Sequence, residues 1–144
     1  MAVTSDLDRG FLSPSARTAH SVPYWEGLAK GRLVLQQCDD CGAITHPPGP
    51  VCTSCQSAKR SYVEASGRGT IYTFTVMHRA MHPEFEPYLP YVVAYVTLEE
   101  GINLATWIVD VDPADVAIGM PVELTIERID DDTTLHRFRP VPER

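Results

Sequence analysis

The chain has 144 residues and a net charge of −7, a length that suits one medium domain or two very small ones. Residues 1–70 carry seven Lys and Arg against six Asp and Glu, whereas residues 71–144 carry five against thirteen. This acidic half disfavours nucleic-acid binding, which needs a basic groove. There is no basic-then-apolar leader at residues 1–10 and no run near the roughly 20 apolar residues of a membrane span. We therefore expect a cytoplasmic protein without a membrane partner.

In chain order, residues 1–20 come first and are polar without periodicity, which predicts an extended arm. Residues 21–31 then predict a short helix. Ser21 can cap this helix, Pro23 suits its first turn and Gly31 can end it. The apolar side of the helix consists of Tyr24, Trp25 and Leu28.

Next along the chain lie its only four cysteines, in two C-x2-C pairs separated by ten residues. Each pair can close a tight turn, and two such turns complete a tetrahedral shell of four sulfurs around one ion. Because the protein fills all four positions, the ion is expected to hold structure rather than perform catalysis. The predicted ligands are Cys38, Cys41, Cys52 and Cys55.

Zinc is the expected ion, within a rubredoxin-like ribbon at residues 32–65. The spacer between the pairs is shorter than the usual range of about 15 to 20 residues, but its glycines and prolines supply the turns of a compact ribbon. The same four sulfurs also fit iron. A disulfide framework is the other alternative, which a reducing compartment disfavours.

From residue 70 onward the hydrophobic period changes to two, as in β-strands. Runs rich in β-branched and aromatic residues predict five strands, at 70–78, 91–98, 103–111, 121–129 and 134–138. Hairpin turns are expected at 99–101 and 130–132, and a helical turn at 112–119. Five short antiparallel strands suggest a small OB-type barrel at residues 66–144. The predicted fold is mainly β, with a helix in residues 1–31, then the ribbon and the barrel.

Several motifs accompany the order of helix, ribbon and barrel. They are Tyr24-Trp25-Glu26-Gly27-Leu28 with Gly31-Arg32-Leu33, Gln37-Cys38-x2-Cys41-Gly42, Pro47-Pro48 before Cys52-x2-Cys55, Ser66-Gly67-Arg68-Gly69-Thr70-Ile71-Tyr72, and Ile118-Gly119-Met120-Pro121-Val122. In these motifs and in their order the chain resembles the acyl-CoA-associated zinc-ribbon and OB-fold proteins, a family long known only as a domain of unknown function. The resemblance covers about residues 20–140. Gln56 departs from the family pattern, because many members have Gly after the last cysteine.

The resemblance implies a non-catalytic accessory subunit that binds and stabilises a thiolase-superfamily enzyme. Such partners are thiolases, hydroxymethylglutaryl-CoA synthases, and lipid-transfer-protein-like aldolases or thiolases that shorten acyl-CoA side chains, including those of steroids. It further implies a hetero-oligomer in which the small protein helps to form the acyl-CoA site. The alternative from another class is a single-stranded nucleic-acid-binding module. A third is an independent acyl-CoA carrier or an enzyme.

Two groups of side chains are candidates for partner binding. One is the apolar side of the helix, and the alternative for it is that these rings fill the gap between helix and barrel. The other is Phe85 and Tyr88 in the proline-rich loop 78–90, which joins the first two barrel strands; an ordinary surface loop is its alternative.

Basic residues near the ribbon are candidates for the phosphates of CoA, with solvated surface as the alternative. They are Lys30, Arg32, Lys59, Arg60 and Arg68. The histidines, including His46 and His136, lie beside no nucleophile, so they are expected to be structural or solvent-facing and no catalytic residue is predicted.

Overall fold

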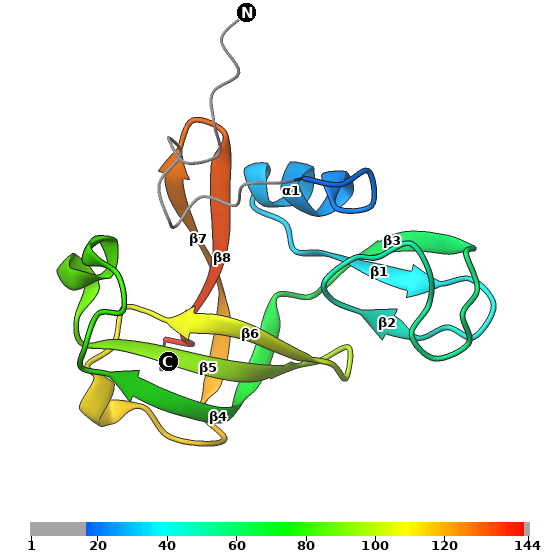
Figure 1. Cartoon of the computed structure of the whole chain (residues 1–144). Helices are drawn as coiled ribbons and strands as arrows, with labels where there is room; N and C mark the ends of the chain where they lie inside the picture. The colour runs from blue at the N-terminus through cyan, green and yellow to red at the C-terminus, as the bar shows by residue number, and fades with distance from the viewer. Residues whose placement is uncertain (1–16, 143–144) are drawn as a thin grey trace, which may run out of the picture.

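The computed structural model describes residues 17–142, so most of the predicted N-terminal arm lies outside the described residues. Figure 1 shows a helix, a small three-stranded ribbon and a barrel. The elements are α1 (Val22–Ala29), β1 (Val34–Cys38), β2 (Ile44–Thr45), β3 (Arg60–Glu64), β4 (Arg68–Met77), η2 (Pro83–Tyr88), β5 (Tyr91–Leu98), β6 (Asn103–Ile108), η3 (Pro113–Asp115), β7 (Pro121–Asp130) and β8 (Thr133–Pro140). Among residues 17–142, no helix has the length and apolar character needed to cross a membrane.

The ribbon is a short antiparallel sheet in the order β2-β1-β3. Its central strand buries Gln36, whose side-chain amide donates to the carbonyl of Gly49 at 2.9 Å and accepts from the N–H of Gly49 at 2.9 Å. This pair of hydrogen bonds fixes the loop between the two cysteine pairs against β1. The stretch between β2 and Cys52 therefore has a defined position although it contains no strand.

The barrel is closed, in the order β4-β5-β6-β8-β7, with β6 and β8 parallel and the other pairs antiparallel. This arrangement of five strands is an OB fold and confirms the predicted architecture. The prediction for the third strand was three residues too long, since β6 ends at Ile108 rather than at Val111. Asp110 takes a left-handed conformation there, with φ of 59°, and the chain leaves the sheet.

Helix α1 packs against β8 and β1. Gly27 permits this contact, because a Cβ atom at this position would lie 2.5 Å from Cγ2 of Val34. Ser21 holds the N-cap position, but its hydroxyl donates to the carbonyl of Thr18 instead of capping the helix. Leu28 and the ribbon residue Leu35 belong to the same buried cluster as the barrel core. The helix and the first ribbon strand are thus joined to the barrel by one hydrophobic core.

Candidate metal centre and aromatic surfaces

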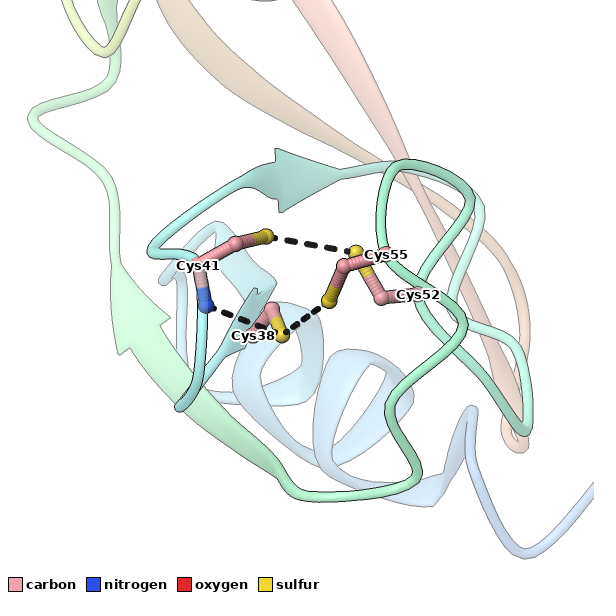
Figure 2. A group of neighbouring side chains, drawn as sticks. All are labelled: Cys38, Cys41, Cys52 and Cys55. Carbon is pink, nitrogen blue, oxygen red and sulfur yellow. Dashed lines mark hydrogen bonds between the residues drawn. The ribbon is translucent and has the colours of Figure 1, made fainter.

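The four cysteine side chains converge on one point, as Figure 2 shows. Cys38 and Cys55 have their sulfurs 3.5 Å apart, those of Cys41 and Cys52 lie 3.6 Å apart, and all four lie within 4.8 Å of one another. Tetrahedral zinc with Zn–S bonds of about 2.3 Å requires sulfurs about 3.8 Å apart, whereas a disulfide requires about 2.05 Å. The four-sulfur cluster therefore fits a metal ion, and all four cysteines are free thiols.

Both metal-binding turns have the same backbone geometry. In the first, the N–H of Gly42 donates to the carbonyl of Cys38 at 3.0 Å; in the second, Gln56 donates to Cys52 at 2.9 Å. Gly42 has φ of 77° and Gln56 has φ of 64°, so Gln56 adopts the left-handed conformation that usually favours glycine. The departure at Gln56 therefore preserves the turn, at a cost on the order of 1 kcal/mol.

Backbone N–H groups tune two of the sulfurs toward the thiolate form that binds metal. The N–H groups of Cys55 and Ser54 lower the pKa of the Cys52 thiol to about 6. That of Cys41 lowers the pKa of Cys38. The N–H of Ser57 also lowers the pKa of Cys55, but the neighbouring sulfurs raise it more, to about 12. A divalent cation at their centre would remove this competition among crowded sulfurs.

A partly buried polar cluster that the sequence did not reveal joins α1 to the barrel. The hydroxyl of Tyr24 lies 2.5 Å from Nδ1 of His136, and Nε2 of His136 lies 2.9 Å from the carbonyl oxygen of Ala105. Because a carbonyl only accepts, Nε2 carries the proton and Nδ1 accepts from Tyr24. Tyr24 and His136 are 112 positions apart, so no local pattern could have paired them.

His46 completes this cluster, with its ring centroid 4.9 Å from that of Tyr24 and 5.9 Å from that of His136. Burial, followed by the charge of His136, lowers the pKa of His46 to about 4. In the unfolded chain a histidine titrates near pH 6.5. His46 is therefore neutral in the folded protein at pH 7 and resists protonation as the pH falls.

This shift predicts acid sensitivity. The unfolded state binds a proton more readily, so the contribution of His46 to stability is fully present above pH 6.5 and is lost as the pH falls towards 4. At pH 5 the loss is expected to be about 2 kcal/mol. Urea unfolding at pH 7 and pH 5, with zinc present, measures it. A His46→Gln variant should lose correspondingly less stability over the same step, and an identical loss in both proteins would contradict the assignment.

The predicted loop residues Phe85 and Tyr88 lie in η2, packed against the barrel. Their ring centroids are 5.9 Å and 5.3 Å from that of Trp107, on which Tyr91 stacks at 4.2 Å. The guanidinium of Arg137 lies 4.3 Å from the Trp107 ring centre. Phe85 and Tyr88 remain half-exposed, so they stay candidates for partner contact. Sequence reasoning missed Trp107, which organises this cluster.

The three predicted anchors on α1 have different surroundings. Tyr24 is 5% exposed and Leu28 is 1% exposed, so the alternative of a core role describes both. Trp25 is half-buried, with its ring 4.9 Å from that of Tyr24 and the guanidinium of Arg17 at 5.0 Å. Of the three, only Trp25 offers a partly accessible ring, and its role in partner binding stays a prediction.

The basic candidates for CoA phosphates do not form one patch. Arg32 and Arg68 line one cavity, but Glu64 and Glu123 line it too. Arg68 also pairs with Glu99 at 3.1 Å. Lys30 is exposed just after α1. The remaining two are Lys59 and Arg60, at the metal-binding end of the ribbon. Arg60 lies opposite Cys38 in the β1–β3 ladder, and its guanidinium donates to the hydroxyl of Thr45.

Comparisons with known proteins identify related chains. Residues 25–59 match the family model for the ChsH2 rubredoxin-like zinc ribbon domain, and residues 62–127 match that for the ChsH2 C-terminal OB-fold domain. A DUF35 domain-containing scaffold protein of Methanocaldococcus jannaschii is 36% identical, over 76% of this chain and 82% of its own length. A solved chain of the Ltp2-ChsH2(DUF35) aldolase has a TM-score of 0.77 and 42% identity, covering 87% of this chain and 97% of that one.

A longer relative is also similar. The probable enoyl-CoA hydratase alpha subunit of Thermomonospora curvata is 45% identical over 81% of this chain. The chain spans only 36% of that protein's length. Most of that protein's length therefore lies outside the region that matches this chain.

Proposed function

Because the chain belongs to the family of ChsH2 and DUF35 zinc-ribbon and OB-fold proteins, we propose that it is a non-catalytic scaffold subunit that binds and stabilises a thiolase-superfamily enzyme acting on acyl-CoA. The observation that carries this proposal is a structural match. The chain aligns with 97% of a solved chain from the Ltp2-ChsH2(DUF35) aldolase. The proposed partner is an aldolase subunit of the Ltp2 type.

The chemistry of the described residues supports a scaffold role. The four-cysteine centre has no open position for water or substrate, so its metal stabilises the ribbon. His136 is engaged on both ring nitrogens, by Tyr24 and Ala105. The hydratase activity in the name of the longer relative belongs to a protein of which this chain spans about a third, and it is not part of the proposal.

Contact with the acyl-CoA itself is a finer part of the proposal. Trp25, Phe85 and Tyr88 are half-exposed rings that would border a site shared with the enzyme subunit. The basic candidates are divided between two regions, and two of them share a cavity with glutamates. We therefore assign the main binding of the CoA phosphates to the enzyme subunit.

Binding to a purified Ltp2 subunit tests the function directly. We expect a stable complex by size-exclusion chromatography with light scattering, a higher melting temperature for the Ltp2 subunit, and greater aldolase activity when the chain is present. Cys52→Ser, which cannot close the metal shell, serves as the control and should do none of these.

An unstructured oligonucleotide should bind weakly or undetectably near physiological salt. Tight, strongly salt-dependent oligonucleotide binding without any Ltp2 complex would favour the nucleic-acid alternative.

A further inference from the structure

The outer face of strands β4, β5 and β6 is unusual in this acidic protein because only Arg68, at the start of β4, brings a charged side chain to these strands. After Arg68 at the start of β4, no Asp, Glu, Lys or Arg occurs in the rest of β4 or anywhere in β5 and β6. Charged residues make up 22% of the whole chain. The other two barrel strands carry several of them, including the pairs Glu127–Arg137 and Glu123–Arg139.

Strand register shows which side chains share this outer face. In β5, alternate residues such as Val92, Ala94 and Val96 are buried, so the residues between them point outward. Residues directly opposite each other lie on the same side of a sheet. Two rows of three side chains therefore cross the outer face of the sheet, and together we call them the uncharged face. The rows are Thr75, Val93 and Trp107, and Thr73, Tyr95 and Ala105.

Composition and exposure distinguish this face from an ordinary solvated sheet. In antiparallel sheets with one solvated face, buried apolar residues usually alternate with polar residues on the outside. Here the outward row includes an aromatic ring instead: Tyr95 is 51% exposed and lies between Thr73 and Ala105. Aromatic residues are enriched, and charged residues depleted, in the cores of protein interfaces. In Figure 1, β4, β5 and β6 lie side by side below α1. OB folds commonly bind their ligands on this part of the barrel.

A hollow of about 270 Å³ adjoins the uncharged face. Val93, Ala105 and Trp107 line it from the face, and Tyr24, Leu135 and His136 line it from α1 and β8. The one charged group in the lining, Arg137, is paired with Glu127 at 2.8 Å and stacked on Trp107. Burial lowers the pKa of His136, which keeps the ring neutral at pH 7. The hollow therefore contains no unpaired charge, and an apolar side chain of a partner protein can bind in it.

We propose that the uncharged face is the docking surface for the acyl-CoA enzyme subunit, with an apolar side chain of that subunit seated in the hollow. This inference rests on the proposed function. Charge complementarity selects the occupant: a charged partner surface would lose hydration here without meeting an opposite charge. A nucleic-acid strand would find stacking rings here, but the Arg beside them, Arg137, is already paired with Glu127. The partner surface is therefore an uncharged protein patch.

Tyr95→Lys and Thr73→Lys, each compared with Ile118→Lys, test the docking surface by titration against the purified Ltp2 subunit. All three side chains are exposed, and the control adds the same charge outside the three strands. We expect each face variant to weaken the complex about 30-fold or more, and Ile118→Lys to bind within about twofold of the wild type. Zinc content and melting temperature of each variant confirm that it is folded.

The outcomes separate the docking surface from the proposed function. If folded face variants bind Ltp2 as tightly as the wild type, the docking surface is overturned and the scaffold function stands. If the wild-type chain itself does not bind Ltp2, both fall together. If the chain alone forms a dimer that Tyr95→Lys dissociates, the occupant is a second copy of this chain and the inference is overturned.

Discussion

Cys52→Ser is expected to abolish metal binding and to unfold the ribbon. The ribbon strands β1, β2 and β3 have five, two and five residues, too few to form a core of their own, so the ion supplies their cohesion. In structural zinc sites the binding free energy, on the order of 10 kcal/mol, is largely folding free energy. Cys52 is fully buried and accepts from the N–H of Ser54 at 3.3 Å, so a serine hydroxyl cannot replace its thiolate.

Elemental analysis and thermal unfolding of the untagged protein measure this effect. The wild type should contain one zinc ion per chain, and the variant none, with a markedly lower melting temperature. Ser54→Ala is a matched control in the same turn, because Ser54 contacts the sulfur through its backbone N–H and the alanine retains that group. A Cys52→Ser protein with stoichiometric zinc and an unchanged melting temperature would show that the ribbon does not depend on the four-sulfur shell.

Arg137→Ala is expected to destabilise the barrel by about 3 kcal/mol, near the lower end of the range for breaking a buried ion pair. The side chain of Arg137 is 9% exposed, it donates to Glu127 at 2.8 Å, and it covers one side of Trp107. Its removal leaves a largely buried carboxylate without its ion-pair partner and takes the guanidinium away from the Trp107 ring. The expected value is near the lower end because Glu127 keeps some access to water.

Urea unfolding of the zinc-loaded protein gives this free energy. Arg139→Ala is the matched control, since Arg139 lies on the same strand and pairs with Glu123 at 3.1 Å, but its side chain is 46% exposed. Breaking this surface pair should cost less than about 1 kcal/mol. Equal losses in the two variants would mean that burial of the Arg137 pair contributes nothing beyond an ordinary surface contact.

The metal centre could be predicted from the sequence because its determinants are local. A C-x2-C spacing closes a turn over four residues, and that geometry is the same wherever the turn is placed. The barrel strands could be predicted for a similar reason, since period-two alternation reports a half-buried strand without reference to its neighbours. Strand ends were less certain: β6 stops at Ile108 because the backbone turns at Asp110, and composition alone does not show this.

The role of the α1 side chains could not be settled in this way. An apolar helix face looks the same in sequence whether it covers its own barrel or a partner. Packing of α1 against β8 decided that Tyr24 and Leu28 belong to the core, while Trp25 remained half-exposed. The basic residues present the same problem: they cluster along the chain, but folding divides them and places glutamates beside Arg32 and Arg68.

Residue types and local spacing were thus sufficient for the four-sulfur metal site, the order of helix, ribbon and barrel, and the family resemblance. Contacts between distant segments required the tertiary structure, because strand pairing and helix docking bring together residues that no sequence period relates. The Tyr24–His136 hydrogen bond and the stacking of Arg137 on Trp107 are of this kind. So is the uncharged face, since three unremarkable β-runs form one surface only when their register aligns Thr73, Tyr95 and Ala105.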